Sequence, residues 1–98
     1  MNENAASSRN PELERCIARL LTELRESKGV SQAALAIELG HDQSFVSRLE
    51  NGQRRVTAAE LLEWAAALDI SFSDLAHELA AIWKEHVETP SIWKRERP

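Results

Sequence analysis

Five hydrogen-bonding side chains fall within one short stretch of the chain, and none of them is large and apolar: Asp42, Gln43, Ser44, Ser47 and Arg48. An amide such as that of Gln43 can bond bidentately to adenine, and the guanidinium of Arg48 can reach a guanine or a phosphate. A polar face of short side chains on a protruding helix is what the major groove of DNA accommodates. The chemistry that this stretch predicts is the recognition of base edges.

Two arginines follow in the loop after Asn51-Gly52. Arg54 and Arg55 would neutralise phosphate charge, which supplies affinity and salt dependence but no choice of sequence. An ordinary solvated loop is the alternative interpretation of this pair. We favour phosphate contact, because the loop comes directly after the candidate recognition residues.

Three residues of this region have two interpretations each. Asp42 can cap the helix that it opens or accept a hydrogen bond from cytosine, and capping is favoured. His41 is expected to be neutral and partly buried, with a pH-sensitive contact as the alternative. Phe45 can touch a thymine methyl group or pack toward the first helix, and the sequence leaves both open.

Nothing in the sequence supports catalysis. His41, His77 and His86 lie at no spacing that would hold a metal on a helix. Cys16 falls within an apolar stripe and has no base on its own face, which favours core packing over redox chemistry. We therefore predict no catalytic residue, no metal, no cofactor and no enzymatic activity.

The elements that position these side chains are predicted to be helices. Apolar residues recur at three- and four-residue steps, and no stretch alternates as a strand would. Residues that can start a helix occur at five places: Asn10-Pro11, Ser31, Asp42, Thr57-x-x-Glu60, and Ser71 or Ser73. The sequence thus predicts an all-α fold of five helices, in which residues 42–51 form the third.

The second and third helices are joined by a turn too short to let them lie antiparallel. Gly40 suits the positive φ that the turn requires, and Ala36 is small where the two helices cross. Residues 31–52 are therefore expected to form a helix-turn-helix pair. We place this pair in one domain of residues 10–88, preceded by a flexible arm (1–9) and followed by a short tail (89–98).

Length and composition limit the class of protein. The 98 residues suffice for one domain, and the net charge of −4 is uneven, since residues 56–90 hold seven acidic side chains and one basic one. A single cysteine predicts no disulfide framework and a cytoplasmic location. No apolar run is long enough for a membrane span, and the N-terminus lacks the pattern of a signal peptide.

Residues 20–75 resemble the helix-turn-helix domain of the XRE family, the group of lambdoid phage repressors and Cro proteins. The resemblance runs in one register through LRESKGVSQAALAIELG, DQSFVSRLENGQRRV, LLEWAAAL and ISFSDL. It implies a five-helix, lambda-repressor-like DNA-binding domain, here with an extended C-terminal helix, that dimerises on a two-fold operator.

The resemblance also implies roles for individual residues. Gln32 would contact a phosphate, and Asn51 with the following basic loop of Arg54 and Arg55 would hold the DNA backbone. Arg25 and Glu50 would form an internal ion pair that ties the first helix to the third. The residues implied to face base edges or nearby phosphates are Asp42, Gln43, Ser44, Ser47 and Arg48.

The fifth helix carries an apolar stripe with two interpretations. The stripe can fold back onto the first helix or pair with a second subunit, and we favour a homodimer. The interface residues that this predicts are Leu75, Leu79, Ile82, Trp83 and His86.

The function that we expect is sequence-specific binding of double-stranded DNA by a dimeric transcriptional regulator, a repressor, with its third helix in the major groove. The alternative is a protein of the same fold that acts through a protein partner, as an antitoxin or as an antagonist of a regulator. In that case the acidic C-terminal half would be the working surface.

Overall fold

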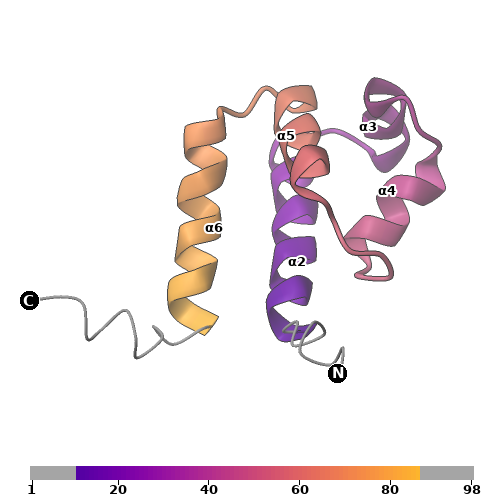
Figure 1. The fold of residues 1–98 in the computed structure, drawn as a ribbon. Coiled ribbons are helices and arrows are strands. Elements are labelled where there is room, and N and C mark those ends of the chain that lie inside the picture. Colours follow the sequence, from indigo (N-terminus) through magenta and orange to yellow (C-terminus); the bar gives the residue numbers. More distant parts are fainter. Residues whose placement is uncertain (1–10, 87–98) are drawn as a thin grey trace, which may run out of the picture.

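Five helices are packed around one another in the computed structural model, which describes residues 11–86 and has no strand among them (Figure 1). The helices are α2 (Pro11–Ser27), α3 (Gln32–Leu39), α4 (Gln43–Glu50), α5 (Ala58–Ala67) and α6 (Phe72–His86). This confirms the all-α class and its five helices. The predicted arm (1–9) and tail (89–98) lie outside the described residues.

Side-chain oxygens cap four of the helix starts, and at α6 Ser71 Oγ accepts from the Asp74 N–H at 3.0 Å. Ser31 Oγ and Asp42 Oδ1 each accept a hydrogen bond of 3.0 Å from the backbone N–H three residues further on. At α5, the Glu60 N–H donates to Thr57 Oγ1 at 3.1 Å, and the Thr57 N–H donates to Glu60 Oε1 at 2.9 Å. These bonds satisfy N–H groups that have no partner inside the helix, so they fix where α3, α4, α5 and α6 begin.

The turn between α3 and α4 depends on Gly40. Its φ is 75°, in the left-handed region that an L side chain resists, and its N–H closes the last turn of α3. Ala36 is 2% exposed where α3 meets α4, which leaves no room for a larger side chain. The turn therefore sets the angle between α3 and α4.

The main core lies beneath this turn and joins α2 to α5. Its centre consists of Leu21, Leu35, Val46, Leu49 and Trp64, all at most 1% exposed. Trp64 brings one polar atom into this core, and its Nε1–H donates to the carbonyl oxygen of Leu21 at 3.2 Å. Helices α2, α3 and α5 thus provide the surface on which α4 packs.

Helix α6 packs along α2. This packing buries part of the apolar stripe of α6 inside the subunit, where a partner cannot contact it. Figure 1 shows α6 on one side of α2, with α3 and α4 on the other. Leu75 is 1% exposed and packs against Leu20 and Ala65, and Leu79 and Ile82 lie half-buried beside them. The prediction of Leu75 as an interface residue is therefore wrong, because this position closes the subunit's own core.

The end of the stripe remains available at the surface. Trp83 is 41% exposed, and Phe72 at the start of α6 is 62% exposed. The prediction for the His86 side chain lies outside what the structure describes. Among residues 11–86, no helix combines the length and the apolar character that crossing a membrane requires.

Candidate nucleic-acid interface

Helix α4 has one buried face and one polar face. Phe45, Val46 and Leu49 point into the core and are at most 6% exposed. The opposite face is formed by Gln43, Ser44, Ser47 and Arg48, of which only Ser47 is half-buried. Because the apolar face is fixed in the core, the polar residues that the sequence singled out are brought together on the outer side of the helix.

An ion pair fixes the last turn of α4 to α2. Arg25 Nε lies 2.7 Å from Glu50 Oε2, and Arg25 Nη2 lies 3.0 Å from Glu50 Oε1. Arg25 Nη1 also donates to the carbonyl oxygen of Val30 at 2.7 Å. The hydrogen bond with Glu50 raises the pKa of Arg25. These are the two residues that the resemblance pairs, and their side chains are only 10% and 3% exposed.

Two glutamines extend this contact toward the outer face of α4. Gln32 Nε2 donates to Glu50 Oε1 at 2.9 Å, and Gln43 Nε2 donates to Gln32 Oε1 at 3.3 Å. The amide of Gln32, predicted to contact a phosphate, is thus used within the protein on both sides. Its contact with Gln43 joins the start of α3 to the outer face of α4, a link that the sequence alone did not reveal.

Asp42 lies at the start of α4 and caps it. Its Oδ1 accepts from Ser44 Oγ at 2.8 Å and from the Phe45 N–H at 3.0 Å. These bonds, the one from Ser44 first, lower the pKa of Asp42 and keep it a carboxylate. Of the two interpretations, capping is the one that the structure contains. Arg48 Nη1 donates to the same Ser44 Oγ at 3.1 Å, so the serine links the cap to the arginine.

The two loop arginines differ in how firmly they are held. Arg54 donates twice to Glu60, with both N–O distances 2.9 Å, and its guanidinium carbon lies 5.1 Å from the centre of the Phe45 ring. The hydrogen bond from Arg54 lowers the pKa of Glu60, and the same bond raises the pKa of Arg54. Arg54 therefore joins α4 to α5.

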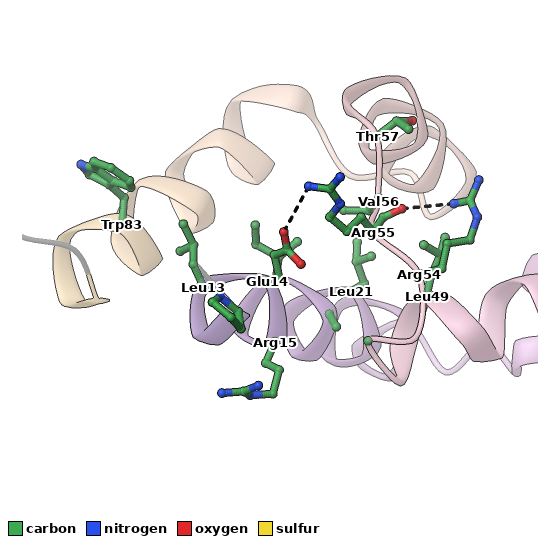
Figure 2. Close-up of a pocket in the computed structure, with 14 residues that line it drawn as sticks. Leu13, Glu14, Arg15, Leu21, Leu49, Arg54, Arg55, Val56, Thr57 and Trp83 are labelled. Atoms are coloured by element: carbon green, nitrogen blue, oxygen red, sulfur yellow. Dashed lines mark hydrogen bonds and ion pairs between the residues drawn. The ribbon is translucent and has the colours of Figure 1, made fainter. Parts of the chain in front are cut away.

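Arg55 is held more loosely. Its guanidinium lies 3.7 Å from Glu14 on α2, and its side chain is 59% exposed, against 38% for that of Arg54 (Figure 2). Phosphate contact was predicted for both arginines alike. The signal that separates them was present in the Thr57-x-x-Glu60 capping box, because it places a carboxylate close to the loop.

Two residues lie beside the interface. His41 differs from its prediction, and the position of Phe45 decides between its two interpretations. His41 is exposed, not partly buried, and its ring stacks on Phe45 with centroids 3.7 Å apart and planes 8° from parallel. The turn after Gly40 keeps His41 at the surface, where it covers the edge of the core. Phe45 is 6% exposed and belongs to that core, so its side chain is not available to a thymine methyl group.

The remaining predicted residue of the site is Asn51, which ends α4 and donates from Nδ2 to Ser47 Oγ at 3.3 Å.

Cys16 is buried. Within residues 11–86, no group of three or more His, Cys, Asp or Glu side chains could hold a metal ion. The arrangement can donate and accept hydrogen bonds across one outer face, with cations at its end.

Comparisons with known proteins agree on a helix-turn-helix fold. A family model described as Helix-turn-helix matches residues 21–75. An uncharacterised HTH-type transcriptional regulator of Sinorhizobium fredii, y4dJ, is 38% identical over 52 residues, which are 53% of this chain and 68% of that protein.

Two solved structures have a similar fold. An XRE-family like protein from Pseudomonas syringae pv. tomato has a TM-score of 0.69 at 31% identity, covering 82% of this chain and 98% of that one. The restriction-modification controller protein C.AhdI from Aeromonas hydrophila has a TM-score of 0.56 at 43% identity, covering 61% and 86%.

Proposed function

The chain belongs to the XRE family of helix-turn-helix transcriptional regulators, and we propose that it binds a specific sequence of double-stranded DNA as a dimer and represses transcription by occupying a promoter. The observation that carries this proposal is the outer face of α4. Its polar side chains are held in place by a buried apolar face and by the Arg25–Glu50 pair. A helix presented in this way fits the major groove.

Base recognition is assigned to the outer face of α4. Gln43 and Arg48 have the longest side chains of this face and the chemistry for adenine and guanine respectively. Ser47 and Ser44 are short enough to let the helix approach the base edges. Because Asp42 caps α4 and bonds to Ser44, its part in recognition is to orient Ser44 and Arg48.

Backbone contacts are assigned to the ends of the helix pair. Asn51 and Arg55 lie at the C-terminal end of α4 and just beyond it, and Gln32 lies at the start of α3. Arg54 adds positive charge from a fixed position beside Glu60. Contacts of this kind set the register of the protein on DNA without selecting a sequence.

A second copy of the chain is the proposed cover for the apolar side chains left at the surface of α5 and α6. Leu62, Phe72 and Trp83 are 49%, 62% and 41% exposed. A two-fold dimer would bury them and place two α4 helices about 34 Å apart, one turn of DNA. The operator would then have two-fold symmetry.

Selection of binders from a pool of random duplexes, at a stated salt concentration near physiological, tests the proposal. Enrichment of a two-fold symmetric motif by the wild-type protein, with loss of one preferred base pair per half-site for Arg48→Ala, is the expected result. Failure to enrich any motif, with circular dichroism showing a folded protein, contradicts the proposal. It would favour a protein partner for the acidic half of the chain.

A further inference from the structure

A groove of about 890 Å³ runs between α2 and the loop that joins α4 to α5, and the features described so far do not account for it (Figure 2). Its apolar lining includes Leu13, Ile17, Leu21, Leu49, Val56 and Trp83. The volume is within the range of about 300–1,000 Å³ that is usual for small-molecule sites.

The base of the groove is apolar and firmly packed. Leu21 and Leu49 are at most 1% exposed and belong to the main core, so the base of the groove is continuous with that core. Ile17 and Val56 are half-buried and leave their outer atoms toward the groove. A ligand seated here would remove apolar surface from water on both sides, which favours binding.

Three arginines line the groove, and they differ in how they are held. The guanidinium of Arg55 lies across the groove from Glu14 at 3.7 Å, a longer separation than a charge-assisted hydrogen bond of about 2.7–2.9 Å. Figure 2 shows the Arg55 side chain directed toward α2 and that of Arg15 directed away from the groove. Arg54 also lines the groove, but both of its terminal nitrogens are bonded to Glu60. Arg55 is thus the cation that an incoming anion can engage.

We propose that this groove binds a small amphipathic anion, whose carboxylate or sulfonate replaces Glu14 at Arg55 and whose apolar body lies along Ile17 and Val56. Charge complementarity with a single guanidinium, together with the size of the groove, identifies this class of ligand. The Arg55 guanidinium cannot serve the ligand and a DNA phosphate at once. The bound anion therefore lowers DNA affinity, a regulatory consequence that rests on the proposed function.

Fluorescence titration of the full chain with anilinonaphthalene sulfonate, an aromatic anion, tests the site directly. Binding of one probe per chain and displacement by octanoate, but not by the uncharged octanamide, are expected. Arg55→Gln and Ile17→Ser should each weaken the affinity for the probe by at least about fivefold. The first removes the cation of the site and the second removes part of its apolar lining. Arg19→Gln, which removes an exposed arginine of α2 outside the groove, should leave the binding unchanged.

Several outcomes would overturn the site. These are equal probe binding by wild type and Arg55→Gln, equal displacement by octanoate and octanamide, or an equal loss with Arg19→Gln. Because Arg55 is exposed, Arg55→Gln should fold normally, so the result does not depend on Ile17→Ser alone. Probe bound per chain that falls as protein concentration rises would make a second copy the occupant, and this also contradicts the proposal.

Retention of the selected DNA duplex, measured with and without octanoate, tests the regulatory consequence. Octanoate should weaken wild-type binding several-fold and have no effect on Arg55→Gln. Specific DNA binding that is indifferent to octanoate would overturn the regulation. If no duplex is bound while octanoate still displaces the probe in an Arg55-dependent way, the proposed function fails and the ligand site stands.

Discussion

Arg25 on α2 and Glu50 at the end of α4 are joined by two parallel hydrogen bonds, of 2.7 and 3.0 Å, between side chains that are almost fully buried. Two charges in this setting attract each other strongly but lose most of their hydration. The pair is therefore weak evidence for a gain in stability. Its geometric consequence is clearer, because it fixes the rotation and the end point of the helix that carries the polar face.

Removing one member of this pair should destabilise the domain. Glu50→Ala leaves the guanidinium of Arg25 buried and unpaired, and we expect a loss of about 3 kcal/mol in the free energy of unfolding. Urea unfolding followed by circular dichroism measures this loss. Glu26→Gln is the matched control, since Glu26 is 65% exposed and lies 3.8 Å from the same arginine. A loss as small as that of the control would show that the pair does not hold α4.

Arg48→Ala should weaken operator binding without affecting the fold. The side chain is exposed, and its guanidinium donates a hydrogen bond to Ser44 on the same helix. We expect a loss of roughly 1–3 kcal/mol in binding free energy and relaxed preference at one base pair. Titration of wild type and variant against the selected duplex and single-base variants measures both. Unchanged affinity and unchanged preference would remove Arg48 from the recognition surface.

The two loop arginines should respond differently to substitution. Arg55→Gln is expected to leave the unfolding midpoint unchanged and to lower the slope of log affinity against log salt by about 0.9 per chain, as loss of one phosphate contact requires. Arg54→Gln is expected to lower the unfolding midpoint, because it removes the link between Phe45 and Glu60. Salt titrations and thermal unfolding of the two variants separate these effects. Identical behaviour in both assays would contradict the distinction.

The sequence predicted the helices well because their ends are local. Ser31, Asp42 and Thr57 each bond to a backbone group only a few residues away, so type and spacing suffice to identify them. The same local signals placed the outer face of α4, since a helix that buries Val46 and Leu49 must expose the side chains between them.

What the sequence missed depends on elements that are distant along the chain. The contact of Gln32 with Glu50, and that of Arg55 with Glu14, require α2, α3 and α4 to be placed relative to one another. Periodicity shows that the apolar stripe of α6 is buried but not what buries it, so it does not separate Leu75, which closes the subunit's own core, from Trp83 at the surface. The exposed position of His41 differs from its prediction for a similar reason, since its stacking on Phe45 depends on the angle between α3 and α4.

The stripe of α6 provides a test of which residues face a second subunit. Leu75→Ala should lower the free energy of unfolding by about 2–5 kcal/mol, because it opens a cavity in the subunit's own core. Trp83→Ser should change stability by less than about 1 kcal/mol and shift the chain toward monomer, because its side chain is at the surface. Urea unfolding and sedimentation equilibrium give the two quantities. An unshifted monomer–dimer equilibrium for Trp83→Ser would place the dimer contact elsewhere.

Acid should weaken the link between the basic loop and α5. The hydrogen bond from Arg54 holds the pKa of Glu60 below its ordinary value of 4.5, so the folded chain binds this proton less readily than the unfolded chain does. The stabilisation is fully present above that ordinary value and is lost as the pH falls through the lower folded value. Thermal midpoints of wild type and Glu60→Gln, measured between about pH 7 and pH 3, should therefore converge toward the acid end. Glutamine retains the capping hydrogen bonds at Thr57, so the difference isolates the charge pair. Glu63→Gln, an exposed position on the same helix, should follow the wild-type curve, and a gap for Glu60→Gln that stays constant with pH would contradict the assignment.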